Sequence, residues 1–468
     1  FFLVFICYRL YNLIQVIKMK SALFIILFFL APMVSWAEET SAKNTTSEIT
    51  MSTTQAMQLA GSMVDHGDYE HALQILTKTP KMNNVALEIE RWFLLAQIAQ
   101  KQGDYDSAIK IYRKILDDQP DLARIRFELA TCYMHKKQWS RADYHLRLAM
   151  AGKDLPENAR KMMNYYRYVV RQNKNWNVWF NIGAAPDNNV NNATGGQECI
   201  LYYGYVLCND LAEPESAIGT NLTLGGNYEF KLSDQWRWKS DANLYSNIYD
   251  KHKFDDLYIG VSSGPRFVWS QGDVWLAGTF ARRWYGWERY NWSAGMRLDT
   301  NYDFTRKLSV GLYLRAMENK YDLYGDFLNG QTYSANVRFT YSFNASVYMN
   351  LRGGITREDA KNPTYSYWQP SVSLGVGAEL PWGFHVYLEP SVYWSVYDDS
   401  RFVASDMQLA EITEHDFTHR YAISISNNKF DIWGFVPTLT FSYTQRDSNI
   451  WQREYNKTAL EFTMQQRF

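Results

Sequence analysis

The sequence lacks the features that identify most enzymes and helical membrane proteins. It contains no nucleotide-binding loop, no Ser nucleophile elbow and no metalloprotease helix motif, so we expect neither catalysis nor a cofactor. Its 468 residues carry a formal net charge of −1, which gives no reason to expect nucleic acid as a partner. Beyond residue 37, no segment reaches the roughly 18 apolar residues that a transmembrane helix needs. Function must therefore be inferred from repeating patterns.

A secretory signal is predicted at residues 19–37. It begins with the short basic segment Met19-Lys20, continues in an apolar run from Ala22 to Val34, and ends in the small-x-small site Ser35-Trp36-Ala37. We expect cleavage after Ala37, which makes the mature chain an exported protein.

The residues on either side of this signal are expected to lie outside the folded domains. Residues 1–18 lack an initiating Met and contain Cys7, and we expect them to be absent from the mature protein. Because Phe1 to Ile17 is also apolar, an uncleaved membrane anchor is the alternative. Residues 38–55 are predicted to form a flexible linker.

A short motif occurs three times in residues 56–172. Gly67-Asp68-Tyr69-Glu70-His71-Ala72 recurs 36 residues later as Gly103-Asp104-Tyr105-Asp106-Ser107-Ala108, and more loosely as Lys137-Gln138-Trp139-Ser140-Arg141-Ala142. The small residues turn the chain between two helices, while the aromatic residue and the alanine pack the helical hairpin. The pattern resembles the tetratricopeptide repeat (TPR). The predicted packing positions are Gly67, Tyr69, Ala72, Gly103, Tyr105, Ala108, Trp139 and Ala142.

Three stacked repeats are near the minimum for a stable array of this kind, and their superhelix leaves a concave groove. We expect a peptide or protein partner in this groove. A spacer or plug that orients the next domain is the alternative. Leu155 to Val170 is predicted to be a capping helix, with Pro156 near its first turn.

From residue 177 to Phe468 the chain repeats segments of roughly ten residues in which apolar and polar residues alternate. In the clearest segment, Gly383 to Tyr397, Trp394 lies on the apolar side and Glu389 on the polar side. Successive side chains of a strand point to opposite faces, so one face suits lipid and the other water. Aromatic residues make up 16% of the chain, as girdles at the membrane interfaces require. The predicted fold is α+β with two domains, an N-terminal α-helical TPR solenoid and a transmembrane antiparallel β-barrel of about fourteen strands.

The predicted connectors between strands are of two kinds. Short ones, such as Ser233-Asp234 and Asn344-Ala345, alternate with longer ones near residues 186–219, Asn319 to Gly330 and Asp399 to Thr418. Periplasmic turns of such barrels are short and outside loops are long. We therefore expect a monomeric barrel in the outer membrane of a Gram-negative bacterium, with the helical repeats in the periplasm.

The predicted inner face of the barrel is strongly polar. Strand Trp292 to Phe304 places Arg297, Asp299 and Asp303 opposite its apolar side, and strand Leu222 to Phe230 places Glu229 there. We expect such a lumen to hold water, salt-bridge ladders or a passing polypeptide.

The last residues alternate up to a terminal aromatic. This ending resembles the signal that the outer-membrane barrel assembly machinery reads, so we expect that machinery and outer-membrane lipid as partners. The residues concerned are Leu460, Phe462, Met464 and Phe468.

Two further groups of residues could form sites. Cys199 and Cys208 lie in a Gly- and Tyr-rich segment that we place outside the barrel, where a disulfide is expected and free thiols or a metal site are the alternatives. Cys132 lies inside a helical repeat, where we expect it to be a small, buried apolar side chain. A predicted outer loop carries a set that could hold a divalent cation or respond to acid pH, although loops are often charged for solubility and we expect no metal. This set is Glu411, Glu414, His415, Asp416 and His419.

The stretch between the two halves is the most diagnostic. Residues 179–194 read WFNIGAAPDNNVNNAT and follow the last predicted helix directly. This stretch is similar to the opening of the barrel in the surface lipoprotein assembly modulators, the Slam family. The resemblance covers nearly the whole mature chain, from the signal through the small repeat domain to a barrel of about this length.

The resemblance implies a function in protein export. Slam-like proteins help client proteins cross the outer membrane, either surface lipoproteins or related soluble secreted proteins, and their clients arrive unfolded in the periplasm. We therefore expect a client protein and periplasmic chaperones as partners. The repeats would receive the client or its chaperone, and the barrel would give passage or a folding edge near its first and last strands.

Three other functions stay open. A polysaccharide exporter also joins periplasmic repeats to a pore, but usually through far longer arrays. A substrate-selective porin would have no use for the repeats. An outer-membrane lipase would need a nucleophile and a base on adjacent strands, and the sequence does not single out such a pair.

Overall fold

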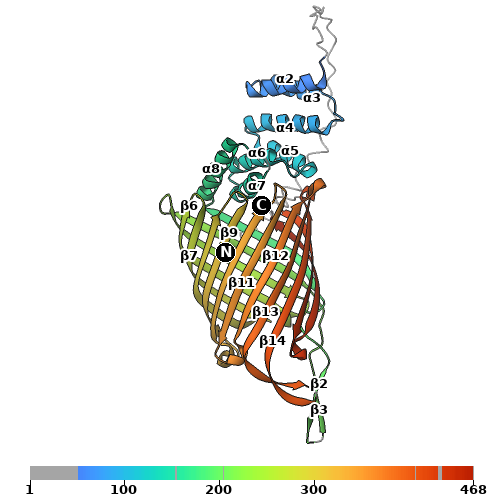
Figure 1. Cartoon of the computed structure of the whole chain (residues 1–468), viewed down its shortest axis with the longest axis vertical. Coiled ribbons are helices and arrows are strands. Elements are labelled where there is room, and N and C mark those ends of the chain that lie inside the picture. Colours follow the sequence, from blue (N-terminus) through green and yellow to red (C-terminus); the bar gives the residue numbers. More distant parts are fainter. Residues whose placement is uncertain (1–50, 153–154, 204, 406, 431–434, 467–468) are drawn as a thin grey trace, which may run out of the picture. The chain divides into compact units, whose positions relative to one another are not determined.

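The computed structural model of the chain shows a helical region followed by a barrel (Figure 1). The predicted signal, the stretch before it with Cys7, linker residues 38–50 and the terminal Phe468 lie outside the described residues. Among the helices that are described, none is both long and apolar enough to cross a membrane. The structure describes residues 51–152, 155–203, 205–405, 407–430 and 435–466.

The described helices between residues 53 and 173 pack as antiparallel hairpins, followed by a final helix. Gly67 and Gly103 each end a helix with a φ of 83°, a left-handed conformation that glycine adopts without steric cost. In the third repeat Lys137 takes this position with a φ of 58°. The helices are α2 (Thr53–Asp65), α3 (Tyr69–Lys78), α4 (Val85–Lys101), α5 (Tyr105–Asp118), α6 (Ala123–His135), α7 (Trp139–Met150) and α8 (Glu157–Asn173).

The repeated motif sets both the caps and the packing of the hairpins. The side chain of Asp68 accepts a hydrogen bond from the backbone N–H of His71, and Asp104 does the same for Ser107, so α3 and α5 begin with the same cap. At the predicted packing positions the three alanines are fully buried, and the three aromatic residues pack partly buried against the core. These residues are Ala72, Ala108, Ala142, Tyr69, Tyr105 and Trp139.

Fourteen strands form a closed antiparallel barrel in which β1 pairs with both β4 and β16. The prediction of a helical array followed by a fourteen-stranded barrel is therefore confirmed. The strands are β1 (Trp176–Asp187), β4 (Ala217–Lys231), β5 (Trp236–Tyr249), β6 (Asp256–Trp269), β7 (Gly272–Tyr285), β8 (Glu288–Asp303), β9 (Leu308–Tyr321), β10 (Gly330–Ser342), β11 (Val347–Ala360), β12 (Tyr367–Glu379), β13 (Phe384–Ser405), β14 (Gln408–Asn427), β15 (Phe435–Ser448) and β16 (Tyr455–Gln466).

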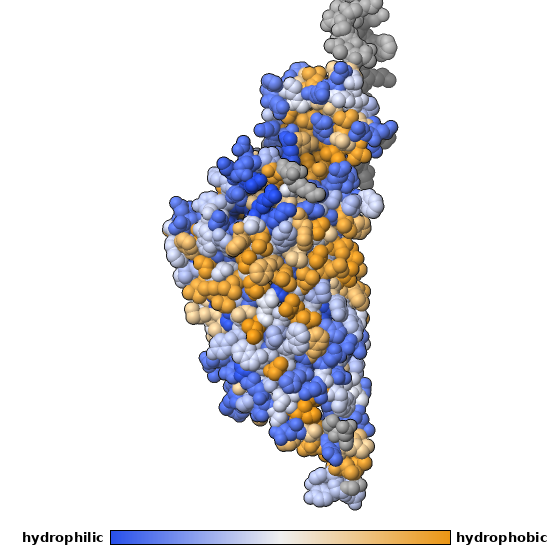
Figure 2. Space-filling view, in the orientation of Figure 1, coloured by the Kyte–Doolittle hydropathy of each residue, from blue (hydrophilic) through white to orange (hydrophobic). Residues whose placement is uncertain are grey.

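Alternation along each strand separates the two faces of the wall. In β13, Trp394 is 48% exposed on the outside, whereas the next residue, Ser395, is 8% exposed on the inside. Apolar side chains gather in a band over the barrel (Figure 2). Such a band matches the hydrocarbon layer of a bilayer.

One predicted outer loop, Asp399 to Thr418, is wrong because it is largely strand, whereas the predicted long connector 186–219 does join two strands of the barrel. The predicted loop Asp399 to Thr418 continues β13 and β14, which pair up to Ser405 opposite Gln408. In the predicted loop 186–219, a separate hairpin of β2 (Gln197–Tyr202) and β3 (Tyr205–Asp210) stands between β1 and β4. Strand pairing can continue beyond the bilayer, where the strands no longer need an apolar face. Hydropathy alone therefore does not show where the strands end.

The β2–β3 hairpin lies beside the far end of β13 and β14 (Figure 1). Cys199 and Cys208 face each other in it and are joined by a disulfide. The hairpin contacts the β13–β14 tip through a hydrogen bond from the Leu201 N–H to the Met407 carbonyl.

Candidate functional site at the barrel mouth

Helix α6 is held to the end of β12 by a buried ion pair. The Arg126 guanidinium, 0% exposed, donates to Glu379 Oε2 at 2.6 Å and to the Pro120 carbonyl at 2.7 Å. The hydroxyl of Tyr144 in α7 donates to the other oxygen of Glu379. Both oxygens of the Glu379 carboxylate therefore accept a hydrogen bond. Loss of Arg126 or of the Tyr144 hydroxyl would leave the buried negative charge of Glu379 without full compensation.

Helix α8 is held to the opposite wall by a second ion-pair cluster. Asp303, at the end of β8, accepts from Arg167 at 2.8 Å and also from Arg171. Arg171 donates to the Ser270 carbonyl in the β6–β7 turn at 2.7 Å. In return, Arg237 of β5 donates to the Arg171 and Gln172 carbonyls at 3.1 and 2.7 Å, which satisfies acceptors that the last turn of a helix leaves open.

Other short turns at this end of the barrel also meet the helices. The Asp121 carboxylate accepts from the Ala345 N–H at 3.1 Å, and Arg113 donates to the Asn428 carbonyl at 2.9 Å. The short turns therefore face the helical domain, as the difference between short and long connectors predicts.

A cavity of about 530 Å³ lies between α7, α8 and the barrel wall. Burial would raise the pKa of Asp143 there, but Arg167, Arg147 and Lys174 outweigh it and hold that pKa well below its usual range. Burial lowers the pKa of the Lys174 ammonium. The positive charges of Arg266 and Arg147 also lower this pKa, while the negative charge of Asp143 raises it. The mouth is thus a partly dry site with more cations than acids.

Ion pairs also join non-adjacent strands along the inner wall of the barrel. Arg297 of β8 reaches Asp241 of β5 at 3.3 Å and Asp299 of its own strand at 2.5 Å. Glu229 of β4 accepts from Arg266 of β6 at 2.7 Å. Their contacts with non-adjacent strands confirm the predicted inward orientation of Arg297 and Glu229, and Asp299 shares this face through its contact with Arg297.

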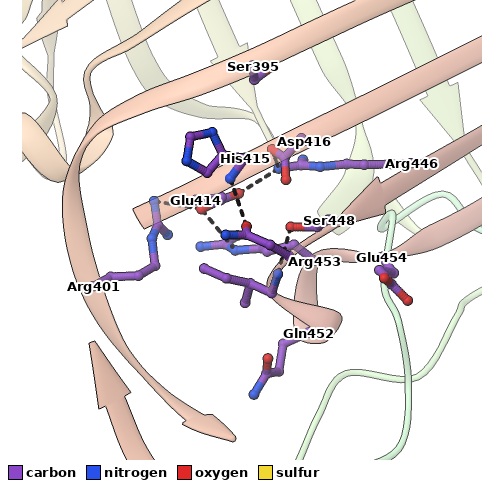
Figure 3. A network of polar contacts seen from close by, with 12 residues as sticks. Ser395, Arg401, Glu414, His415, Asp416, Arg446, Ser448, Gln452, Arg453 and Glu454 are labelled. Atoms are coloured by element: carbon purple, nitrogen blue, oxygen red, sulfur yellow. Dashed lines mark hydrogen bonds and ion pairs between the residues drawn. The ribbon is translucent and has the colours of Figure 1, made fainter. Parts of the chain in front are cut away.

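The residues 411–419 that could have held a cation are divided between the two faces of strand β14. Glu414 and Asp416 point inward, where Glu414 pairs with Arg401 at 2.8 Å and Arg446 at 2.7 Å (Figure 3). His419 faces the other way and makes an edge-on contact with Tyr421, with ring centroids 5.7 Å apart. Residues one apart in a strand lie on opposite faces, so this set is not gathered into one ligand sphere. The inward acids are neutralised by arginine instead.

The seam between β1 and β16 closes the barrel. β1 pairs with β4 along its whole length, from Trp176 to Asp187, and among the described residues it pairs with β16 at residues 181–184 and at Asp187. Between these two stretches Pro186 has no N–H to donate. Of the predicted assembly-signal residues, Leu460 and Phe462 are 44% and 52% exposed on the outside of β16, and Met464 lies opposite Ile182.

Comparisons with known proteins agree in one family. The family model described as surface lipoprotein assembly modifier matches residues 176–468, and that for the N-terminal TPR repeats of the same family matches residues 48–146. The chain is 23% identical to the surface lipoprotein assembly modifier of Pasteurella multocida, over 80% of this chain and 75% of that protein. It is 22% identical to surface lipoprotein assembly modifier 1 of Haemophilus influenzae, over 85% and 80%. It is 21% identical to the hemophilin secretion modulator of Acinetobacter baumannii, over 80% and 78%.

Proposed function

The chain belongs to the surface lipoprotein assembly modifier family, and on that premise we propose that it moves client proteins across the outer membrane. Its barrel lies in the outer membrane, and its TPR domain lies in the periplasm. The clients we propose are surface lipoproteins or related soluble secreted proteins. Support for the second class comes from the name of the Acinetobacter relative, a hemophilin secretion modulator.

The observation that carries the proposal is the attachment of the repeat array to the barrel's short-turn end. Arg126 binds Glu379 on one side of the mouth, and Arg167 and Arg171 bind Asp303 on the other. A polypeptide that docks on the repeats is thereby held beside the entrance to the lumen. In this proposal the TPR domain receives the client or its chaperone in the periplasm, and the barrel carries it onward.

The seam between β1 and β16, the first and last strands of the barrel, is the place that we propose for this transfer. A β-rich client needs strand partners while it folds, and an edge strand offers unpaired N–H and C=O groups. In our proposal β1 supplies such an edge when it parts from β16.

Surface display of a client tests the proposed function. A candidate client is expressed in cells with and without this protein, and its exposure on intact cells is measured by added protease. We expect protease-sensitive client only when the full chain is present. A chain without residues 52–172 that still assembles its barrel is the matched control for the TPR domain, and we expect it to display less client. Equal display with and without the full protein would refute the proposed function.

A further inference from the structure

The lumen wall built by β8 to β11 carries an arginine from each strand. The strand register places Arg297 of β8 directly opposite Arg315 of β9, and Arg338 of β10 directly opposite Arg352 of β11. Like charges directly opposite each other destabilise an antiparallel pair. A wall of this kind therefore needs anionic compensation.

That compensation is incomplete among the described residues. Arg297 has Asp241 and Asp299, and Arg352 has Glu389 at 3.3 Å. Arg338 makes one hydrogen bond, at 3.2 Å, and its acceptor is the neutral side chain of Asn301.

Arg315 is less satisfied still. No described residue forms an ion pair or hydrogen bond with its guanidinium, and its Nε is buried without a partner. Two cations on this wall therefore lack a carboxylate.

The same imbalance continues into the mouth. Arg147 of α7 has only a 3.5 Å contact with Asp143, which also pairs with Arg167. No described carboxylate lies within ion-pair distance of the Lys174 ammonium, which lines the same 530 Å³ cavity. The Asp303 carboxylate in this cavity already forms ion pairs with two arginines of α8.

Two cavities join these cations into one path. The mouth cavity of about 530 Å³ and a lumen cavity of about 390 Å³ share Arg338, Asn301 and Gly311 in their linings. Each falls in the size range of small-ligand pockets. Their linings run from α7 and α8 at the mouth to β8–β11 of the barrel wall. Arg315 lines neither cavity, but it lies directly opposite Arg297, which lines the lumen cavity. The basic path consists of Arg147, Lys174, Arg338, Arg352, Arg297 and Arg315.

We propose that the basic path binds an extended, acidic segment of polypeptide, whose Asp and Glu carboxylates pair with Lys174, Arg338 and Arg315. Guanidinium groups match carboxylates in a two-pronged geometry, and an extended chain presents charged side chains at regular intervals. The spread of the cations over both cavities favours such a chain over a single small anion. The inference rests on the proposed function in one respect only, that the segment belongs to an exported client.

The test uses the full-length protein purified in detergent and two fluorescent peptides of equal length. One peptide alternates Glu with Ser and the other alternates Lys with Ser, and binding is followed by anisotropy. We expect the acidic peptide alone to bind, and salt to weaken its binding. Combining Lys174→Gln with Arg338→Gln should weaken binding about tenfold or more, because bonds to charged groups are lost. Arg338→Lys should retain more affinity than Arg338→Gln.

The matched control is Arg357→Gln, which removes a cation that pairs with Asp398 and stacks on the exposed Trp368. We expect it to bind the acidic peptide as the unaltered protein does. If the double variant does not assemble, Arg315→Gln alone replaces it, and heat-modifiable gel mobility reports assembly for each variant.

Three results would overturn the inference. They are equal binding of both peptides, unchanged affinity in assembled variants of the basic path, and displacement of the acidic peptide by inorganic phosphate at the peptide's own concentration. Because binding is measured without export, its failure is separable from failure of client display. Acidic-peptide binding without any client display would refute the proposed function and leave this site standing.

Discussion

The Glu379 carboxylate links the barrel to the helical domain through a buried ion pair with Arg126. It is 9% exposed, its partner Arg126 is 0% exposed, and their atoms lie 2.6 Å apart. Exposed ion pairs contribute little to stability because water and salt screen them. A buried pair differs, since removing one partner strands the other charge at a cost of about 3–5 kcal/mol.

Arg126→Gln is therefore expected to loosen the helical domain from the barrel. Undocking would expose Arg171 and Lys174, next to the junction with β1, and limited trypsin digestion should then separate the domains faster. Lys136→Gln is the matched control, because it breaks an exposed pair with Asp106 inside the helical domain. Equal digestion rates for Arg126→Gln and the control would contradict this role for the buried pair.

The cysteines give a second prediction for single residues. Burial raises the pKa of the Cys132 thiol to about 12, so it should stay unreactive at neutral pH in the folded protein. Cys199 and Cys208 lie in the exposed hairpin and are joined to each other. On intact cells a membrane-impermeant maleimide should label the chain only after a reducing agent is added.

Replacing both hairpin cysteines by Ser should abolish this labelling, whereas Cys132→Ser should leave it unchanged. Labelling before reduction would argue against the disulfide. No labelling after reduction would argue against an outer position of the hairpin.

Among the strands, β1 and β16 form the seam that closes the barrel. β1 pairs with β4 from Trp176 to Asp187 and, among the described residues, with β16 at residues 181–184 and at Asp187. No turn joins these first and last strands of the barrel, so we expect opening to begin at this seam rather than elsewhere in the wall.

A covalent lock on the seam tests whether export needs it to open. Ala184 lies opposite Phe462 of β16 and opposite Thr220 of β4. We expect cross-linking of Ala184→Cys with Phe462→Cys to reduce client display strongly, and cross-linking of Ala184→Cys with Thr220→Cys to have little effect. Full display from the locked β1–β16 pair would leave the lumen as the route.

Strands β13 and β14 show how polar pairing extends an element above the membrane. Glu414, 1% exposed, is neutralised by Arg401 from β13 and Arg446 from β15, so three strands are joined by one acid. The pairing of β13 with β14 therefore continues through residues whose sequence predicts a charged loop. Alternation then places His415 and His419 on the other face, which separates them from the acids.

For the whole molecule, the decisive feature is the placement of the helical domain at the barrel's mouth. Contacts reach it from the ends of β8 and β12 and from the β6–β7 and β10–β11 turns. These points surround the mouth, so the domain should limit the passage of ions through the lumen.

Removal of residues 52–172 is therefore expected to raise the conductance of the barrel in planar bilayers. The full-length Lys136→Gln variant is the control, and its conductance should match that of the unaltered protein. Arg126→Gln should lie between the two if it loosens the domain without removing it. The covering role would be disproved by an unchanged closed pore after the deletion, provided that the barrel has assembled.

The sequence by itself determined the two architectures, because each produces a pattern that repeats over a short stretch of the chain. The recurrence of the Gly-Asp-Tyr motif in residues 67–72 and 103–108 specified helical hairpins, since turn, cap and packing residues act within a few positions. Alternation every second residue specified the barrel and its two faces, since strand geometry alone directs side chains. The junction at residues 179–194 indicated the family that the comparisons then established.

Only the tertiary structure decided which residues meet. Arg126 and Glu379 are 253 positions apart, and a charged residue between Ile125 and Phe127 in a repeat is the one local hint that it has a buried partner. The seam depends on the register of the first and last strands, and the basic path depends on four neighbouring strands and two helices. Such contacts follow from closure of the barrel and docking of the helices, which no local period encodes.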